Sequence, residues 1–190
     1  MSIRLSRSDW EVRPVCYDVA LRIVVAHHYA AGGSNTAVYL HGLFRAGDIF
    51  DEQCQGVAWW LPPTRSAAEA TFPQRWQGVL CLSRLVILPG VPANACSFLL
   101  ARSRKLIDRM KWPCLVTYAD EWKGHTGAIY RADNWTYKGL TKSQRIYLIN
   151  GRMTARKAGP RTRNHAEMLA LGAEVAGSFA KHKFVRIESK

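Results

Sequence analysis

The chain has 190 residues, of which 48% are hydrophobic and 22% are charged, and it carries a formal net charge of +13. This length is typical of one domain with a real core, and the longest apolar runs are far too short to cross a bilayer. The N-terminal segment lacks the apolar stretch of a signal peptide, so we expect a soluble cytoplasmic protein that does not bind membranes.

The cysteines argue against a disulfide framework and against a structural zinc site. There are five, an odd number, spread widely along the chain and without a C-x-x-C pair. Most stand in apolar sequence, so we expect small core residues rather than nucleophiles. They are Cys16, Cys54, Cys81, Cys96 and Cys114.

The positive charge is concentrated in the last third of the chain. Residues 138–190 contain 12 Lys and Arg against 3 Asp and Glu, whereas residues 1–137 contain 15 against 11. This imbalance predicts a polyanionic partner, nucleic acid before membrane, because no basic amphipathic helix with a strong apolar face stands out. The side chains expected to contact phosphates are Lys138, Lys142, Arg145, Arg152, Arg156, Lys157, Arg161 and Arg163.

The first half of the chain predicts one helix and three strands. Pro14 suits a first helical residue, and apolar side chains then recur at helical spacing until the helix ends near residues 27–29. Runs rich in β-branched and aromatic residues follow, separated by turn-forming sequence. The expected strands cover residues 36–44, 55–61 and 76–88.

The second half alternates helices and strands before a basic segment. A helix over 93–110 keeps its apolar side chains on one face. The basic run 152–164 contains Gly159-Pro160, so we expect an exposed arm or loop there. The other expected elements are strands at 114–118, 135–140 and 144–149, the last two joined by a Thr-Lys-Ser turn, a short helix at 126–132, a helix at 165–180 and a closing strand at 184–187.

Three places in this order of elements carry chemically useful side chains. His28 and Tyr29 end the first helix and open onto a Gly-rich loop. Arg84 interrupts an apolar strand, where an isolated charge is costly, so it must be paired or face a cleft. A buried strand delivers Asp120, followed by His125 between two glycines. The carboxyl end of such a strand is where α/β folds usually hold ligands.

The order of the elements resembles the GNAT acyltransferase fold. Within it, H-H-Y near the first helix, S-R-L-V-I in the long strand and T-Y-A-D…G-H-T-G-A-I-Y-R-A-x-N-W-x-Y-x-G resemble the phage Mom family, over roughly residues 10–150. The resemblance implies one α/β (α+β) domain over 1–190, with a central mixed sheet flanked by helices. We expect this core at about 10–150, followed by a basic arm and helix over 151–190.

The resemblance also implies an activity. Mom proteins convert adenine in phage DNA to N6-carbamoylmethyladenine, which protects the DNA from host restriction enzymes. It therefore implies a transferase acting on double-stranded DNA in the host cytoplasm, and a homodimer is compatible with it. The target base lies inside the duplex, so we expect it to be flipped out and stacked on Tyr29, Trp59 or Trp122.

The loop after the long strand argues against the usual GNAT donor, acetyl-CoA. GNAT enzymes usually hold the coenzyme A pyrophosphate on a Gly-rich loop, but the loop at 88–94 reads L-P-G-V-P-A-N, and its two prolines lack N–H donors. Arg84, Gly90 and Asn94 are the candidates for holding a phosphate there. The added CH2-CO-NH2 group also contains a nitrogen that acetyl-CoA lacks. We therefore expect an activated glycine such as glycyl-tRNA, with acetyl-CoA as the alternative, and the basic surface suits tRNA as well as DNA.

The chemistry of acyl transfer assigns roles to these residues. An adenine amine loses a proton as the new bond forms, so a carboxylate or imidazole must lie nearby. Asp120 is the expected general base, or the group that orients it. The expected helpers are His28, Tyr29 and His125 as its partners, Tyr130 as a donor to the developing oxyanion, and Arg84 as the anchor of the donor's carbonyl or phosphate.

Three other interpretations stay open. His28, Tyr29 and Asp120 offer nitrogen and oxygen ligands suited to iron, provided that the helix has ended by His28, because adjacent helical residues point about 100° apart. The chain can instead be an acetyl-CoA-dependent GNAT N-acetyltransferase acting on a small amine or a protein. It can also be a non-catalytic basic DNA-binding module, which leaves Arg84 and the H-H-Y loop unexplained.

Overall fold

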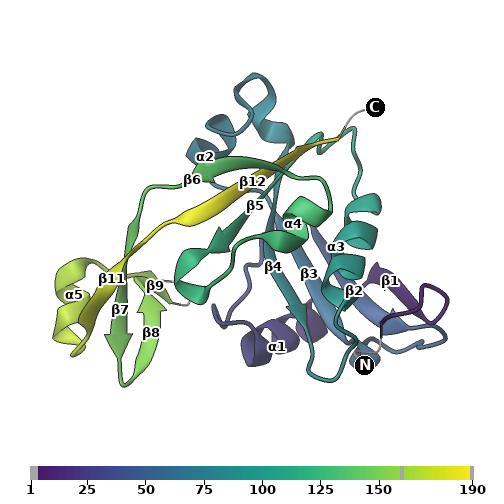
Figure 1. Cartoon of the computed structure of the whole chain (residues 1–190), viewed down its shortest axis with the longest axis horizontal. Helices are drawn as coiled ribbons and strands as arrows, with labels where there is room; N and C mark the ends of the chain where they lie inside the picture. Colours follow the sequence, from purple (N-terminus) through teal and green to yellow (C-terminus); the bar gives the residue numbers. More distant parts are fainter. Residues whose placement is uncertain (1–3, 159–160, 189–190) are drawn as a thin grey trace.

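The computed structural model describes residues 4–158 and 161–188, which form a seven-stranded mixed sheet with helices on both faces (Figure 1). The strand order is β1-β2-β3-β4-β5-β12-β6, so the expected α/β class is confirmed. No helix in these two ranges is long and apolar enough to span a membrane. The elements are β1 (Trp10–Pro14), α1 (Tyr17–His27), β2 (Tyr39–Arg45), β3 (Gly56–Leu61), α2 (Arg65–Glu69), β4 (Val79–Ile87), α3 (Ala95–Lys105), β5 (Cys114–Asp120), α4 (Ala128–Ala132), β6 (Thr136–Leu140), β7 (Gln144–Ile149), β8 (Arg152–Ala155), β9 (Lys157–Ala158), β10 (Arg161–Thr162), α5 (His165–Ala170), β11 (Glu174–Phe179) and β12 (Lys181–Ile187).

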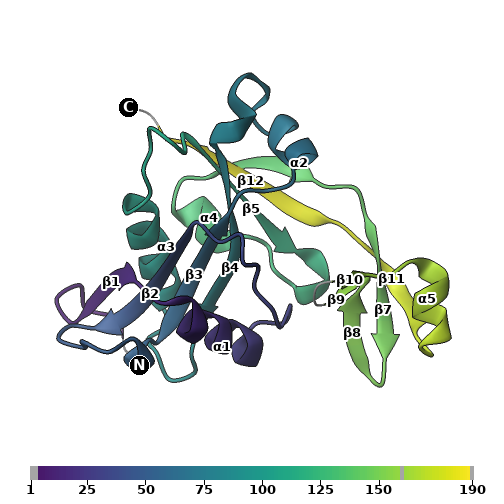
Figure 2. The ribbon, with the colours of Figure 1, turned by 180° about the vertical axis from the view of Figure 1, so that it is seen from behind.

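Strand β3 shows how the sequence builds two layers of core. Successive side chains of a strand point to opposite faces of the sheet. Trp59 therefore packs in the cluster that contains Val24 of α1, while Trp60 packs in the cluster that contains Leu99 of α3. All four side chains are fully buried. Figures 1 and 2, from opposite sides, show α1 over one face of the sheet and α3 and α4 over the other.

Strands β4 and β5 run parallel and then separate at the centre of the sheet. They pair only over residues 79–82 and 114–117. At the last shared pair, Thr117 Oγ1 donates to Leu82 O at 3.1 Å. Beyond it, β4 continues against β3 and β5 continues against β12. The carboxyl halves of both strands thus diverge. The residues predicted for the site on these strands, Arg84 and Asp120, lie in the diverging halves.

The basic region is inserted between two neighbouring strands of the sheet rather than appended after it. Residues 141–180, which we call the basic arm, contain a three-stranded sheet in the order β11-β7-β8, the β9–β10 pair and α5 (Figure 2). After the arm, β12 returns to the main sheet between β5 and β6. The expected division into a core at about 10–150 and an extension over 151–190 is therefore wrong at its C-terminal end, because β12 belongs to the core.

Two further expectations about the arm are wrong. The helix expected over 165–180 ends at Ala170, because Gly172 takes a left-handed φ of +74° and the following residues pair with β7 as β11. The two strands expected around the Thr-Lys-Ser turn are present as β6 and β7, which belong to different sheets, since β6 pairs with β12 and β7 with β11 and β8. The run expected to be an exposed arm or loop contributes β8, β9 and β10.

The start of the first helix is also corrected. Pro14 ends β1 instead of opening α1, which begins at Tyr17. β1 lies at the edge of the sheet, where a residue without an N–H is tolerated. The other expected elements are present with shifted ends, and the largest change is α3, which stops at Lys105 instead of Met110.

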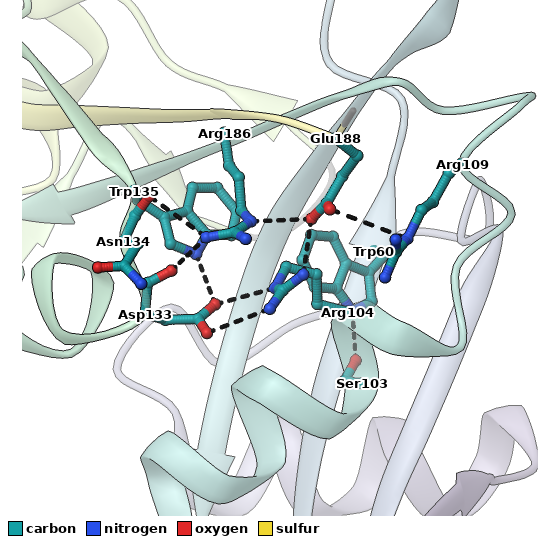
Figure 3. A network of polar contacts seen from close by, with 9 residues as sticks. All are labelled: Trp60, Ser103, Arg104, Arg109, Asp133, Asn134, Trp135, Arg186 and Glu188. Carbon is teal, nitrogen blue, oxygen red and sulfur yellow. Dashed lines mark hydrogen bonds and ion pairs between the residues drawn. The ribbon is translucent and has the colours of Figure 1, made fainter. Parts of the chain in front are cut away.

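A buried group of charges ties the C-terminal strand to the helices. Arg104 of α3 contacts Asp133 through Nε at 3.0 Å and Glu188, just after β12, through Nη1 at 2.9 Å (Figure 3). Arg186 adds a contact from Nε to Glu188 Oε1 at 3.0 Å, and Trp135 Nε1 donates to Asp133 at 2.9 Å. Segments more than fifty residues apart are joined by these contacts, which hold β12 in the sheet.

Replacing Arg104 by methionine should remove a partner of the buried Glu188 and of the half-buried Asp133. Breaking a buried ion pair from one side costs about 3–5 kcal/mol, so we expect Arg104→Met to lower the free energy of unfolding in urea by about that amount. Arg102→Met, at an exposed position of the same helix, is the matched control and should change it by less than about 0.5 kcal/mol. Equal stability of the two variants would contradict this role of Arg104.

A second buried polar group sits where α3 meets the sheet. His41 is 2% exposed, and its Nδ1 lies 2.8 Å from Ser103 Oγ. The same hydroxyl accepts a hydrogen bond from Trp60 Nε1 at 2.7 Å. Burial lowers the pKa of His41 from 6.5 to about 4, so the imidazole is neutral at physiological pH.

Acid should weaken the fold through His41. Its pKa is about 4 in the folded chain and about 6.5 in the unfolded chain, so the unfolded chain takes up the proton first as the pH falls. The stabilisation is complete above about pH 6.5 and declines toward pH 4. We expect His41→Gln to lose less unfolding free energy than the unaltered protein between about pH 7.5 and about pH 5, in urea titrations at each pH. A parallel loss in both proteins would refute the expectation.

Candidate active site

The diverging ends of β4 and β5 border a pocket of about 370 Å³. This volume falls in the range of small-ligand sites, roughly 300–1,000 Å³. The pocket walls come from the end of α1, the second half of β4, the end of β5 and residues 124–130. Of the residues predicted from the sequence, the pocket is lined by His28, Tyr29, Arg84, His125 and Tyr130.

Asp120 joins this wall through Tyr29. The carboxylate ends β5 and is 4% exposed, and the Tyr29 hydroxyl donates a short hydrogen bond to its Oδ2. Its Oδ1 lies 2.7 Å from Lys181 Nζ and forms an ion pair with it, but the geometry of this contact is not that of a hydrogen bond. Burial, and then the bond to Asp120, raises the pKa of Tyr29 well above its ordinary value. Tyr29 is therefore a phenol at neutral pH, with its proton directed at the carboxylate.

His28 is a neutral imidazole that serves as a donor. Its ring stacks on Tyr29 with 4.3 Å between centroids. Burial, followed by the charge of Arg84, lowers the pKa of His28 from 6.5 to about 4. Its Nδ1 accepts a hydrogen bond from Ala30 N at 3.1 Å, so the proton of the neutral ring lies on Nε2. In this state His28 can donate to a carbonyl oxygen but cannot act as the base at Nε2.

From the sequence, Arg84 must either be paired with an opposite charge or face a cleft, and the structure places it in the wall of the pocket. Its Nη1 donates to Ser83 O at 2.7 Å and to Ser83 Oγ at 2.8 Å, and its Nε donates to Gly32 O at 3.1 Å. Neutral oxygens therefore hold the guanidinium and leave its positive charge in the pocket wall. The contact with Gly32 also fixes the loop that follows Tyr29. A positive group in this place attracts a carbonyl oxygen or a phosphate.

The remaining aromatic candidates differ in their access to the pocket. Trp122 and His125 meet the Tyr29 ring edge-on, with centroids 5.7 Å and 5.8 Å away. Tyr130 is 8% exposed, and burial raises its pKa to about 12. Trp59 is fully buried in the core, so the expectation that it stacks a flipped base is wrong.

The loop expected to hold a phosphate is largely engaged within the chain. Asn94 Oδ1 accepts from Leu5 N at 2.6 Å, and its Nδ2 donates to Leu5 O at 3.4 Å. Ala95 N, at the start of α3, donates to Pro92 O at 2.9 Å. Gly90 is exposed, with a φ of +83° and open space around it. These contacts engage the Asn94 side chain and the first N–H of α3.

The contacts of Asp120 with Tyr29 and Lys181 bear on the iron interpretation. The helix has ended before His28, whose ring stacks on Tyr29, so that condition is met. However, Tyr29 and Lys181 engage the two oxygens of Asp120. A cation would also lie near the positive charges of Arg84 and Lys181. In the described part of the chain, no three His, Cys, Asp or Glu side chains are grouped for a metal.

The basic side chains of the C-terminal third reach solvent. Residues 142–163 contain seven Lys and Arg and no Asp or Glu. Lys157 and Arg161 have side chains that lie outside the described part of the structure. Of the other predicted phosphate contacts, Arg163 is half-buried, and the exposed ones are Lys138, Lys142, Arg145, Arg152 and Arg156.

Lys181 is the residue that sequence reasoning missed. It belongs to the site only because β12 pairs with β5, which places Lys181 directly opposite Asp120. No local pattern marks it, since the segment K-H-K-F-V-R-I reads as an ordinary strand with basic residues on its surface. Lys181 could have been identified only by predicting that β12 pairs with β5.

Solved acetyltransferases share the fold at low sequence identity. The ribosomal-protein-S18-alanine N-acetyltransferase from Escherichia coli aligns with a TM-score of 0.57 and 9% identity, covering 95% of both chains. The spermidine N-acetyltransferase from Vibrio cholerae, solved in complex with CoA and spermine, aligns with a TM-score of 0.56 and 8% identity, covering 97% of this chain and 98% of that chain. No curated protein matches the sequence. These likenesses confirm the GNAT acetyltransferase fold.

The family match is more specific and covers almost the whole chain. The Mom protein family matches residues 9–189. This range includes the H-H-Y, S-R-L-V-I and T-Y-A-D segments, and it extends the resemblance beyond residue 150 to the basic arm and β12. With its GNAT fold and its pocket between β4 and β5, the protein belongs to the Mom family.

Proposed function

We propose that this protein transfers a glycyl group to the exocyclic amine of adenine in double-stranded DNA. The final product would be N6-carbamoylmethyladenine, which protects phage DNA from host restriction. The observation that carries the proposal is the contact of Tyr29 with Asp120 at a pocket that also holds His28 and Arg84, in a chain of the Mom family.

Tyr29 is positioned to pass a proton to Asp120. When the adenine nitrogen bonds to the acyl carbon, it must lose a proton. The phenol oxygen of Tyr29 accepts that proton while its own proton moves along the existing hydrogen bond to Asp120 Oδ2. The raised pKa of Tyr29 means that no free phenolate accumulates. The same path returns the proton to the oxygen of the departing donor, so the step is balanced.

His28 and Arg84 provide donors for the acyl carbonyl. Its oxygen gains negative charge as the amine attacks, and donors fixed in place before the reaction stabilise that charge. The Nε2–H of His28 does so without protonating the ring, because the pKa of His28 is about 4. Arg84 adds a full positive charge from the opposite element, β4.

The atoms of the product indicate the donor. N6-carbamoylmethyladenine equals adenine plus glycine minus one water. Glycyl transfer to N6 leaves a free glycyl amine, which can attack C6 through a five-membered ring. The bond between C6 and the original nitrogen then breaks, and that nitrogen becomes the terminal amide. An ester of glycine, such as glycyl-tRNA, supplies all of these atoms without an oxidant or a reductant.

The basic arm supplies a surface for nucleic acid. Its exposed Lys and Arg side chains suit the phosphates of DNA and of tRNA. The target adenine must leave the duplex to reach the pocket. Tyr29 is 40% exposed and stands beside Trp122, so these two rings are the supports for a flipped base.

Acetyl-CoA-dependent N-acetylation is the second candidate, favoured by the fold and by the CoA in the Vibrio cholerae neighbour. The contact of Asn94 with Leu5 and the two prolines of the loop count against it. Saturable binding of coenzyme A by the purified protein would favour it. A non-catalytic DNA-binding module does not account for the partly buried contact between Tyr29 and Asp120.

Expression in bacteria should modify plasmid adenine, and Asp120→Asn should abolish the modification. The asparagine keeps the size of the side chain but cannot take the proton from Tyr29, and losing such a group lowers rates by about 10²–10⁴. Mass spectrometry of nucleosides from the plasmid measures the yield. Asp108→Asn, at an exposed position, is the control and should leave the yield unchanged. If plasmid DNA from cells that express the unaltered protein contains only unmodified deoxyadenosine, the proposal is wrong.

Feeding the same cells 15N-glycine should place the label on the nitrogen bonded to C6. The proposed ring closure attaches the glycine nitrogen to C6 and moves the adenine nitrogen to the amide. Fragmentation of the modified nucleoside separates the two nitrogens. Label found only in the amide, or absent from both positions, would show that the glycyl rearrangement is wrong.

A further inference from the structure

The root of the basic arm lies beside the carboxylate of the site. The chain leaves the main sheet after β6 and returns at the start of β12, whose first residue is Lys181 (Figure 1). In the register of β12 on β5, Lys181 is directly opposite Asp120. Its Nζ lies 2.7 Å from Asp120 Oδ1, with the lysine side chain 38% exposed and the aspartate side chain 5% exposed. The lysine therefore reaches from the first residue after the arm to an almost buried charge.

Backbone hydrogen bonds hold both ends of the arm in this position. Where the chain leaves and returns, Thr141 N donates to Lys181 O at 2.9 Å, and Lys181 N donates to Thr141 Oγ1 at 3.0 Å. One residue earlier, Ala180 N donates to Glu121 Oε2 at 2.8 Å. Glu121 is the next residue after Asp120, so the same short segment that carries the carboxylate also binds the root of the arm.

Lys181 completes the charge balance of Asp120. A carboxylate removed from water is costly unless a cation or several donors face it. Tyr29 donates a hydrogen bond to Oδ2, and the Lys181 ammonium, 2.7 Å from Oδ1, balances the charge of the carboxylate. Two other cations lie nearby: Arg84 donates hydrogen bonds to Ser83 and Gly32, and Lys123 Nζ lies over the Tyr29 ring, 5.3 Å from its centroid. Without Lys181, the carboxylate has no comparable contact at Oδ1 to stop it from turning away from Tyr29.

We propose that Lys181 is a positioning residue that fixes the Asp120 carboxylate toward Tyr29 and so couples the basic arm to the pocket. This inference rests on the proposed function for its activity readout. It assigns Lys181 no contact with DNA, donor or reacting atoms. The competing assignment is a phosphate contact, because the side chain is partly exposed and belongs to the basic region.

The test compares Lys181→Met and Lys181→Arg with Lys183→Met. Lys183 lies two residues along the same face of β12, pairs with Tyr118 and contacts Ala70 O at 3.5 Å, so it controls for the loss of a positive charge from this strand. Three quantities are measured for each full-length protein: the yield of modified adenine in plasmid DNA, the affinity for duplex DNA at several salt concentrations, and the 19F resonance of Tyr29. The resonance comes from 3-fluorotyrosine labelling and is identified by its loss in Tyr29→Phe.

We expect Lys181→Met to lower the modification by about tenfold or more, because the proton acceptor is no longer held in line with Tyr29. Its DNA affinity should stay within about twofold, and its salt dependence should be unchanged. The Tyr29 resonance should shift. Lys181→Arg should recover part of the yield and the resonance, since it keeps the charge with a different geometry. Lys183→Met should match the unaltered protein in all three. If Lys181→Met does not fold, Lys181→Gln replaces it.

Two results would overturn the assignment. A loss of DNA affinity and salt dependence in Lys181→Met, like that expected for Arg152→Ser/Arg156→Ser, would make Lys181 a phosphate contact. An unchanged yield with an unchanged Tyr29 resonance would make the ion pair irrelevant. If the unaltered protein modifies no adenine, the proposed function fails, and the Tyr29 resonance alone decides whether Lys181 holds Asp120 in place.

Discussion

The separation of β4 and β5 beyond Leu82 and Thr117 is the constraint on which the site depends. Buried strands keep pairing because each lost pair leaves backbone N–H and C=O groups without partners. Here the outer edge of each strand stays paired beyond that point, since β3 continues along β4 and β12 continues along β5. The two central strands therefore stay extended while their carboxyl ends diverge. The pocket follows from this strand order, and the return of β12 beside β5 is as necessary for it as β4 and β5 themselves.

Two titratable side chains of the pocket, His28 and Tyr29, are neutral at physiological pH. Burial and the neighbouring Arg84 keep His28 neutral, and burial and the bond to Asp120 keep Tyr29 a phenol. The charged groups around His28 and Tyr29 include Asp120, Lys181, Arg84 and Lys123, whose Nζ lies 5.3 Å from the centroid of the Tyr29 ring. One acceptor thus faces one phenol, while donors line the other wall. This division is what acyl transfer to a weak nucleophile requires, because the proton and the developing negative charge go to different places.

The parts of this structure that the sequence predicts are those with local signals. The abrupt change from the apolar run of β5 to Asp120 marks the end of a buried strand, and the charge of Arg84 inside an apolar run marks a cleft. Pairing between distant strands has no such signal. The segment 165–180 has apolar side chains that fit a helix, yet Gly172 stops α5 and the remainder pairs with β7. Lys181 and the insertion of the arm depend on the same kind of long-range pairing, and periodicity in one chain does not reveal it.

Under the proposed function, the position of the arm links DNA binding to the pocket. A basic extension joined by a free linker would raise the local concentration of DNA without affecting the pocket. This arm is instead inserted between β6 and β12, which are neighbours in the sheet, and both of its ends are hydrogen-bonded beside Asp120. Under the proposed function, the arm that binds the duplex and the segment 120–121 are therefore joined by hydrogen bonds and by β12. The arm then belongs to the architecture of the site as much as the pocket does.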